Sequence, residues 1–391
     1  MTRTQQTPLL PPVGDATAAN VFMTVLTRGP IARSEIAYTL GLSAGTISRS
    51  TKPLLEAGYL IEDGAADNSR PGRPTMPLRV VAEREFVIGV KLTGDHLVGV
   101  VVDLLANVRA SREVSLTATD VDSVVAALAG LVAQLRLAVD GPITRLGVGL
   151  GGHVDPAAGT VRYAPFLDWR DVPLARILSA ATGLPVVVEN DVNALTVAEQ
   201  WFGAGIDVPS FAVVTIGAGV GCGLVLNGGL VHGASGLAGE LGHIPLDPAG
   251  PPCPRCGNTG CVEAAVADSA IVGRITQASG RDGLDILAAA QLARTGDAAA
   301  AAAFTAAGQV LGRALATVAN LLNPNRIILS GEGLAASDLF ETAARQAFYT
   351  HAYGSAGDCE LLTRPLPDDT WARGAAAVAI QHLFVARAPG R

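Results

Sequence analysis

Residues 183–194 read Gly183-Leu184-Pro185-Val186-Val187-Val188-Glu189-Asn190-Asp191-Val192-Asn193-Ala194 and carry the strongest structural signal in this 391-residue chain. The run Pro185–Glu189 is apolar and rich in valine, which predicts a buried strand. Similar apolar runs recur from Glu85 onward and alternate with stretches of helical periodicity. This alternation predicts an α/β fold.

We expect the body of the chain to form two similar α/β halves with a glycine-rich cleft between them. The first half is predicted to hold a three-strand meander, a helix and one further strand, over Phe86–Leu92, Leu97–Val102, Val108–Leu116, Val121–Ala138 and Leu146–Leu150. The second half is predicted to repeat this arrangement, with helices among its strands Pro185–Glu189, Phe211–Ile216, Cys222–Leu226 and Arg326–Leu329.

Length and composition exclude several classes of protein. A chain of 391 residues predicts two or three domains, and 49% hydrophobic against 16% charged residues excludes a disordered chain. The mean hydropathy of +0.37 raises the question of a membrane. Residues 208–239 carry no ionised side chain, but nine glycines interrupt them, as in strands joined by turns. With no apolar core of a signal peptide near Met1, we expect a soluble cytoplasmic protein without a membrane partner.

Residues 1–80 are expected to form a separate N-terminal domain. They hold eight basic and six acidic residues, whereas the whole chain carries a net charge of −7. Three short helices are predicted between residues 17 and 64, with Gly41 as the tight turn after the second and Ser43 as the N-cap of the third, Ala44–Ala57. Pro53 lies inside the third helix and is expected to kink or shorten it.

The third helix has the character of a DNA recognition helix. Its N-terminal end presents small and polar side chains suited to the major groove, namely Ser43, Ala44, Gly45, Thr46, Ser48 and Arg49. The strip Asp63–Pro77 contains Arg70 and Arg73 on a proline-stiffened backbone, which suits a narrow minor groove. An interdomain linker and a protein-docking bundle are the alternatives for these two features. Together they favour a winged helix-turn-helix that binds double-stranded DNA.

A metal site is predicted near the middle of the chain. Cys253, Cys256 and Cys261 lie within nine residues of one another, and His243 lies ten residues before the first of them. A Cys3His set with this spacing is typical of a closed, structural zinc site. Disulfides are the less favoured alternative. Cys222 and Cys359 are expected to be small buried side chains.

Three ordered motifs resemble those of the ROK family of repressors, open reading frames and sugar kinases. They are residues 183–194, the run Gly239-Glu240-Leu241-Gly242-His243 and the run Cys256-Gly257-Asn258-Thr259-Gly260-Cys261-Val262-Glu263. The resemblance covers nearly the whole chain, including the helix-turn-helix that marks the repressor branch. It implies an actin-like, hexokinase-like body of two lobes over residues 84–391, with a sugar in the cleft and a zinc knuckle at residues 243–261.

The resemblance also implies a set of sugar-binding residues. Carboxylates and amides bind sugar hydroxyls by directional hydrogen bonds, and the implied set is Gly152, Asn190, Asp191, Glu240, His243 and Glu263. In the family's kinases the aspartate at the position of Asp191 is the general base. The family's Cys-x-Cys-Gly is one residue longer here, so we expect a rearranged knuckle that retains its structural zinc.

One departure from the family separates an enzyme from a sensor. The kinases carry Asp-x-Gly-Gly-Thr at the first phosphate loop, whereas this chain has Lys91 in place of the aspartate and only Gly94 of the two glycines. Ala218 replaces a usual threonine in the second loop. Because phosphoryl transfer depends on positioning and charge, we expect no kinase activity.

The expected function is that of a DNA-binding transcriptional regulator, a repressor of carbohydrate-related genes. Its effector is expected to be a sugar or a sugar phosphate, whose phosphate Lys91 would suit. A homodimer or homotetramer would match a two-fold-symmetric operator. An ATP-dependent sugar kinase with a fused DNA-binding head is the alternative, and a regulator that has lost its ligand is a third possibility.

Overall fold

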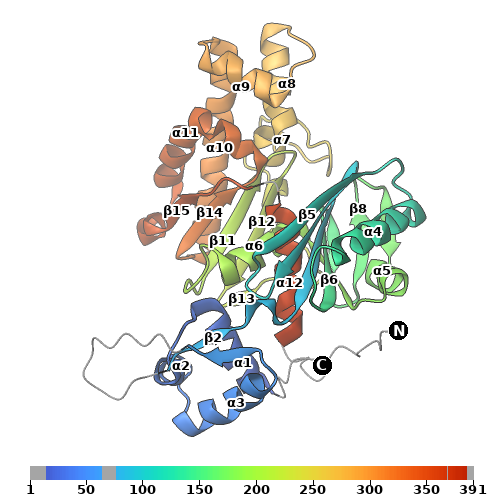
Figure 1. Cartoon of the computed structure of the whole chain (residues 1–391). Helices are drawn as coiled ribbons and strands as arrows, with labels where there is room; N and C mark the ends of the chain where they lie inside the picture. Colours follow the sequence, from blue (N-terminus) through green and yellow to red (C-terminus); the bar gives the residue numbers. More distant parts are fainter. Residues whose placement is uncertain (1–14, 64–75, 368, 385–391) are drawn as a thin grey trace. The chain divides into compact units, whose positions relative to one another are not determined.

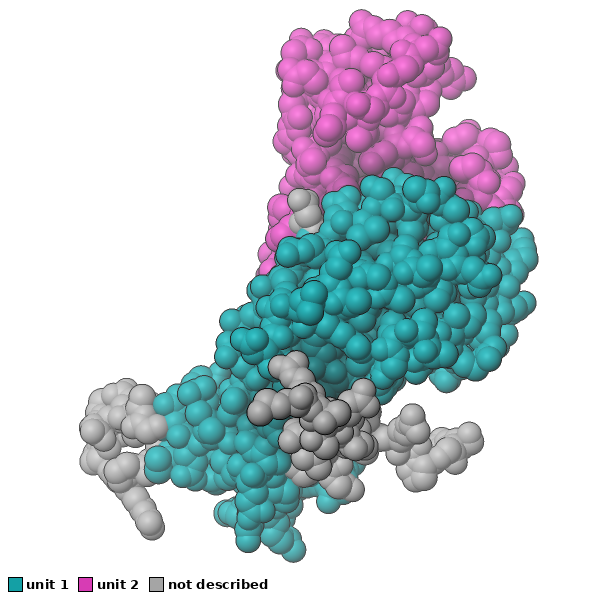
Figure 2. Space-filling view, turned by 45° about the vertical axis from the view of Figure 1, so that its right-hand side comes forward, with its two compact units in different colours: residues 1–206, 369–391 teal, residues 207–368 magenta. Residues whose placement is uncertain are grey.

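The computed structural model describes residues 15–63, 76–367 and 369–384 (Figure 1). The chain divides into two compact units (Figure 2). Unit 1 comprises residues 1–206 and 369–391, and unit 2 comprises residues 207–368. Within the described ranges, each helix is too short or too polar to cross a membrane. A domain boundary between residues 80 and 84 stays a prediction.

The N-terminal part of unit 1, which we call the head, has three helices and a two-stranded sheet. Its elements are α1 (Ala16–Arg28), α2 (Arg33–Leu40), α3 (Ala44–Glu56), β1 (Leu60–Glu62) and β2 (Leu78–Val80). Gly41 ends α2 with a left-handed φ of 62°, and the Ser43 hydroxyl accepts a hydrogen bond from the Thr46 N–H at 3.1 Å. The three helices, the glycine turn and the serine cap are confirmed.

Two details of the head differ from expectation or refine it. Helix α3 continues three residues past Pro53, so the expected shortening is wrong. Pro53 cannot donate to the Arg49 carbonyl, so α3 continues past it with one internal hydrogen bond fewer. Strands β1 and β2 pair antiparallel, and the Asp63 N–H donates to the Pro77 carbonyl at 2.8 Å. The strip between residues 63 and 77 therefore joins two paired strands. Arg70 and Arg73 lie outside the described residues.

The rest of unit 1 is built on a five-stranded sheet of order β10-β6-β3-β4-β5. Strand β3 pairs antiparallel with β4 and parallel with β6. The residues between β6 and α5 in the chain form a small antiparallel sheet of order β7-β8-β9. The elements are β3 (Phe86–Leu92), β4 (His96–Asp103), β5 (Val108–Ser115), α4 (Val121–Arg136), β6 (Ile143–Leu150), β7 (His153–Asp155), β8 (Thr160–Ala164), β9 (Trp169–Val172), α5 (Leu174–Thr182), β10 (Val186–Asn190), α6 (Asp191–Phe202) and α12 (Thr370–Phe384).

Unit 2 is built on a second five-stranded sheet, of order β13-β12-β11-β14-β15. Strand β11 pairs antiparallel with β12 and parallel with β14. The elements are β11 (Phe211–Ile216), β12 (Val220–Leu226), β13 (Gly229–Leu230), α7 (Glu263–Val266), α8 (Asp268–Ser279), α9 (Ile286–Arg294), α10 (Ala298–Leu322), β14 (Arg326–Ser330), α11 (Ser337–His351) and β15 (Glu360–Thr363). Short 3-10 helices lie at Ala82–Arg84, Leu241–His243, Glu332–Ala336 and Gly354–Asp358.

The two sheets have the same plan, which confirms the prediction of two similar halves. In each, the two strands on one side of the central strand follow in successive antiparallel pairs, and the two on the other side follow in successive parallel pairs. The assignment of Pro185–Glu189 to the second half is wrong. The corresponding strand β10 pairs parallel with β6 at the edge of the first sheet, because helix α5 returns the chain to that sheet.

Helix α12 lies against the first sheet at backbone contact distance. A Cβ atom on Gly89 of β3 would overlap the carbonyl oxygen of Ala372, and one on Gly147 of β6 would overlap that of Ala375. On the far side, a Cβ on Gly374 would come within 3.0 Å of the backbone of Ala194 in α6. Glycine is therefore required for α12 to lie between the sheet and α6.

We predict that Gly89→Ala lowers the free energy of unfolding by about 1–3 kcal/mol or more, because the methyl group must push α12 off the strand. Urea denaturation followed by circular dichroism measures this loss. The matched control is Gly130→Ala, on the exposed side of α4, where an added Cβ meets no atom within 4 Å. The control should leave stability unchanged or raise it by up to about 1 kcal/mol. Equal stability of both variants would contradict close packing of α12.

Candidate functional site

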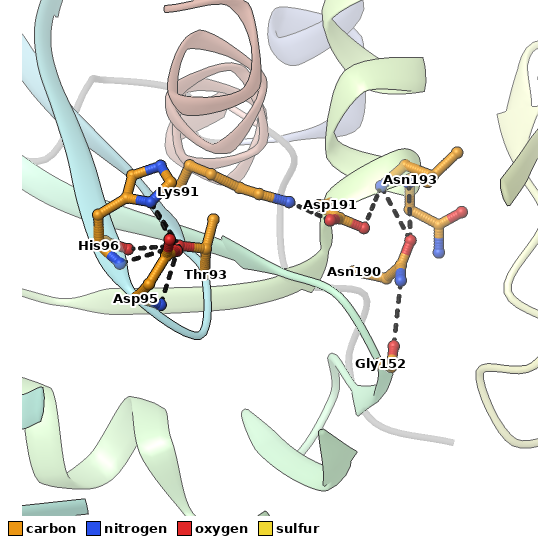
Figure 3. A network of polar contacts seen from close by, with 9 residues as sticks. Lys91, Thr93, Asp95, His96, Gly152, Asn190, Asp191 and Asn193 are labelled. Carbon is orange, nitrogen blue, oxygen red and sulfur yellow. Dashed lines mark hydrogen bonds and ion pairs between the residues drawn. The ribbon is translucent and has the colours of Figure 1, made fainter. Parts of the chain in front are cut away.

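Lys91 and Asp191 form an ion pair at one end of the first sheet (Figure 3). Lys91 lies near the end of β3, and Asp191 is the first residue of α6. The Lys91 ammonium donates to Asp191 Oδ2, while Asp191 Oδ1 accepts from the Val192 N–H at 2.9 Å. The two side chains are 14% and 13% exposed. Both oxygens of the carboxylate are therefore engaged, in a place with limited access to water.

Asn190 positions Asp191. Its Oδ1 caps α6 by accepting hydrogen bonds from the N–H groups of Val192 and Asn193, at 3.0 and 3.1 Å. Its Nδ2 donates to the Gly152 carbonyl at 3.0 Å, which ties the start of α6 to the loop after β6 (Figure 3). The structure thus brings together three residues of the predicted sugar set, Gly152, Asn190 and Asp191.

Aromatic side chains lie beside this ion pair. The ring of Trp371, in the first turn of α12, lies 4.7 Å from the Lys91 ammonium, within reach of a cation–π interaction. A Cβ on Gly151 would lie 3.5 Å from Asp191 Oδ2 and 3.7 Å from the ring of Phe166. A glycine at 151 therefore leaves room between a carboxylate and an aromatic ring, a combination that suits a sugar.

The turn that follows Lys91 is held by its own polar side chains (Figure 3). The Thr93 hydroxyl donates to Asp95 Oδ1 at 2.8 Å, and the His96 N–H donates to the Thr93 hydroxyl at 3.0 Å. Hydrogen bonds of the Asp95 carboxylate to the Thr93 hydroxyl and to the His96 ring, whose Nδ1 lies 2.7 Å from Asp95 Oδ1, lower the pKa of Asp95. Asp95 therefore stays ionised and directed at its own turn.

His243, Cys253, Cys256 and Cys261 form one cluster in unit 2. Their ligand atoms all lie within 4.8 Å of one another, including His243 Nδ1 at 3.7 Å from Cys253 Sγ. Four donors about 2.0–2.3 Å from a central ion fit within that spread. The cluster can therefore hold a metal, and all four predicted ligands are brought together.

The backbone of the knuckle is arranged for such a site. The Cys253 N–H donates to the Asn258 carbonyl at 2.7 Å, and the Gly257 N–H donates to the Cys253 carbonyl at 2.9 Å. A Cβ on Gly260 would overlap the carbonyl oxygen of Asp247, so a glycine is needed just before Cys261. A hydrogen bond from the backbone of Asn258 lowers the pKa of the Cys256 thiol, whereas burial raises that of Cys261 to about 12.

The two cysteines outside the cluster are buried, as predicted. Cys222 is 6% exposed and Cys359 is 7% exposed, both in the core of unit 2. Burial raises the pKa of the Cys222 thiol to about 12 and that of Cys359 to about 11. Neither is a reactive thiol at neutral pH.

Glu263, at the start of α7, is also paired with a cation. Arg255, one of the two residues between Cys253 and Cys256, lies with its Nε 2.8 Å from Glu263 Oε1. Glu263 Oε2 accepts from the Val220 N–H at 3.1 Å. Both residues line a cavity of about 800 Å³ in unit 2, together with Arg274 of α8 and Ala218 of the second phosphate loop. This carboxylate, like Asp191, has both oxygens engaged.

Glu240 is the most exposed of the predicted sugar residues in unit 2. Its side chain is 54% exposed, and Oε2 lies 3.9 Å from His243 Nε2. His243 therefore faces the thiols with one ring nitrogen and Glu240 with the other. The two predicted roles of His243, as metal ligand and as sugar ligand, use different atoms.

The predicted DNA-binding residues lie on the open side of α3. Thr46 is half-buried, and the others of the described set are exposed, namely Ser43, Ala44, Gly45, Ser48 and Arg49. On the opposite side, Ile47 and Leu54 are fully buried in the core of the head. The helix therefore presents to solvent the side chains that the sequence singled out.

Sequence reasoning missed two residues, one in each unit, that lie beside predicted sugar-binding carboxylates or their partners. Trp371 lies 280 positions from Lys91 along the chain and belongs to no local motif, so nothing in its surroundings marked it. Arg255 lies between Cys253 and Cys256, where this chain is one residue longer than the family's motif, and that insertion was the available signal. Trp371 is an aromatic neighbour of Lys91, the partner of Asp191, and Arg255 is a basic neighbour of Glu263.

A double-mutant cycle measures the strength of the Lys91–Asp191 pair. For Lys91→Met and Asp191→Asn, we predict a coupling energy of about 1–3 kcal/mol, because both side chains are largely shielded from water. The matched control is the exposed Lys52–Glu56 pair, 3.8 Å apart with side chains 74% and 66% exposed, which should couple by less than about 0.5 kcal/mol. Urea denaturation supplies both values. Equal coupling in the two pairs would contradict a shielded ion pair.

Comparisons with known proteins agree with this geometry. The xylose repressor of Bacillus subtilis is 27% identical, over 92% of this chain and 94% of its own length. The crystal structure of a ROK family transcriptional regulator, a homologue of the Escherichia coli MLC protein, matches 94% of this chain and 95% of that chain, with 28% identity and a TM-score of 0.81.

A kinase of the same fold also matches. A ROK family glucokinase from Streptomyces griseus, solved with glucose and AMPPNP, is 29% identical and covers 75% of this chain and 98% of its own, with a TM-score of 0.66. The model of the ROK family matches residues 87–382. Since that match covers most of the chain and the fold agrees, the protein belongs to the ROK family.

Proposed function

We propose that this protein is a transcriptional regulator, a repressor of carbohydrate-related genes whose affinity for operator DNA changes when a sugar binds. The observation that carries the proposal is a single helix, α12, which contacts both the Lys91–Asp191 site and the head. The likeness to a xylose repressor also supports the proposal. It covers 92% of the chain, which is more than residues 84–391 alone could supply, so part of the head is included.

Helix α12 joins the two places through its ends. Trp371 in its first turn lies over the Lys91 ammonium. Phe384, its last residue, stacks on Phe22 of α1 with ring centroids 4.0 Å apart and planes 25° apart, and meets Tyr59 edge-on at 6.1 Å. A change at the ion pair that shifts α12 would therefore be passed to the core of the head. Such a connection is needed if ligand binding is to favour one arrangement of the head.

The head is the DNA-binding part of this proposal. The N-terminal end of α3 would enter the major groove and read base edges with Ser43, Ala44, Gly45, Thr46, Ser48 and Arg49. Arg70 and Arg73 would contact the minor groove beside it. A homodimer or homotetramer would place two such heads on a two-fold-symmetric operator in the cytoplasm.

The proposal assigns no kinase activity to the chain. Asp191, the position of the general base in the family's kinases, is bound by the ammonium of Lys91. Lys91 itself occupies the position where the kinases have an acidic residue for their metal ion and phosphates. The sugar would instead be recognised by Asp191, Glu240, His243 and Glu263, with Gly152 and Asn190 positioning Asp191.

We further propose that the Cys3His cluster binds a structural zinc ion. Thiolates and imidazole are the ligands that zinc prefers in closed tetrahedral sites, and four protein ligands leave no position for a substrate. The zinc would stabilise the loop that carries His243 and lies next to Glu263 in the chain.

The function is tested by fluorescence anisotropy on DNA from upstream of the protein's own gene, at fixed salt. We predict specific binding, and a change of at least about tenfold in operator affinity with one member of a panel of free and phosphorylated sugars that includes xylose, glucose and N-acetylglucosamine. Arg49→Ala should weaken operator binding by about tenfold, since one good base contact is worth 1–3 kcal/mol. Turnover of ATP with any sugar of the panel would contradict the proposal.

The variant Phe384→Leu extends the same experiment to helix α12. It keeps an apolar side chain but removes the ring that stacks on Phe22. The ratio of the operator affinities measured with and without sugar should approach one, while sugar binding itself persists. An unchanged ratio would show that α12 does not connect the sugar site with the head.

Zinc binding is tested by metal analysis of the purified protein. We predict one zinc ion per chain, its loss in Cys256→Ser, and a melting temperature lower by several degrees, given about 2–4 °C per kcal/mol in a unit of this size. The control Cys359→Ser, in the same unit but outside the cluster, should retain the zinc. Full zinc content in Cys256→Ser, or none in the unmodified chain, would overturn this assignment.

A further inference from the structure

We propose that the effector of this protein carries a fixed negative charge, a phosphate ester or a carboxylate, which Lys91 binds in exchange for Asp191. The inference rests on the proposed function and deepens it, since it names the class of sugar. Lys91 is then the residue that selects the ligand, and Asp191 is released to accept sugar hydroxyls.

A ligand that binds at Asp191 meets contacts that are already made. One Asp191 oxygen accepts from the Lys91 ammonium and the other from the Val192 N–H, so a sugar hydroxyl that binds in the place of Lys91 must displace the ammonium. A neutral sugar that displaces Lys91 leaves an ammonium group without a counter-charge, at a side chain that is only 14% exposed. An unpaired charge in such surroundings is costly.

An anionic sugar avoids this cost. Its charged group replaces the Asp191 carboxylate as the partner of Lys91, so the ammonium stays paired while the carboxylate turns to the sugar hydroxyls. The ring of Trp371, 4.7 Å from the ammonium, limits the places to which Lys91 can withdraw. Asp95, four residues further along the chain, is 84% exposed and bound to His96 and Thr93, so it offers Lys91 no substitute.

A second, independent pair in unit 2 has the same character. Glu263 is held by Arg255 at 2.8 Å, and its side chain is 9% exposed. The cavity beside it is lined by a second arginine, Arg274. Two carboxylates of the predicted sugar set are therefore each neutralised by a basic side chain. A carboxylate that a cation already balances repels an anionic ligand less than an unpaired carboxylate would.

Calorimetric titration of the full chain without DNA tests the inference. The probes are glucose, glucose 6-phosphate and glucuronate, N-acetylglucosamine and its 6-phosphate, and xylose with xylose 5-phosphate. We expect a charged probe to bind at least tenfold more tightly than its neutral parent. The 6-phosphate and glucuronate arms separate a phosphate from a carboxylate. A neutral probe that binds as tightly as its charged counterpart, or more tightly, overturns the inference.

Variants of Lys91 show whether this residue is responsible. Lys91→Met should weaken the charged probe at least tenfold and leave its neutral parent no weaker, while Lys91→Arg, which keeps the charge, should retain the preference. The matched control is Arg112→Met, on an exposed position of β5 in the same sheet. Equal weakening of charged and neutral probes by Lys91→Met would mean that Lys91 only positions Asp191, and overturns the inference.

The two proposals fail in different ways. Binding of a charged sugar that leaves operator affinity unchanged would contradict the sugar-responsive repressor and keep the selection by Lys91. A neutral sugar that changes operator affinity, with no charged sugar bound more tightly, would contradict the selection and keep the repressor.

Discussion

The close approach of α12 to the first sheet is the constraint on which the rest of unit 1 depends. Glycines at 89 and 147 let the carbonyls of α12 lie where a Cβ would stand, and Gly374 lets α6 approach from the other side. Backbone packing at this distance joins α12, α6 and the strands β3 and β6 into one block, so a displacement of one element is passed to the others. Lys91 and Asp191 are both carried by members of that block.

The head packs on the end of α12 and is therefore in contact with this block. Phe22 and Tyr59 of the head pack on Phe384, so the aromatic core of the head extends onto the last turn of α12. A rigid helix transmits a displacement from one end to the other, whereas a loosely packed one would absorb it. The fold thus joins a sugar-kinase body to a winged helix-turn-helix by packing as well as by the chain between them.

In this member of the ROK family, cations lie beside the acids that a kinase would use. Lys91 binds Asp191 in unit 1, and Arg255 binds Glu263 in unit 2. Each carboxylate keeps its position through a backbone N–H, from Val192 or Val220, so the frame of the site is intact while its charge is balanced. A general base cannot act while an ammonium holds it, but such a pair can exchange partners with a ligand.

Local patterns along the chain were sufficient for much of the structure. Periodicity located the three helices of the head and most strands, and cysteine spacing located the cluster, because these features depend on neighbours in sequence. The placement of β10 in the first sheet was beyond such patterns, since an edge strand joins whichever sheet its crossover helix returns it to. The partners of Asp191 and Glu263 depend on folding as well: Lys91 lies 100 residues from Asp191, and Trp371 reaches them from the far end of the chain. The sequence determines which side chains are charged, but which charged side chains form pairs depends on how the strands and helices pack.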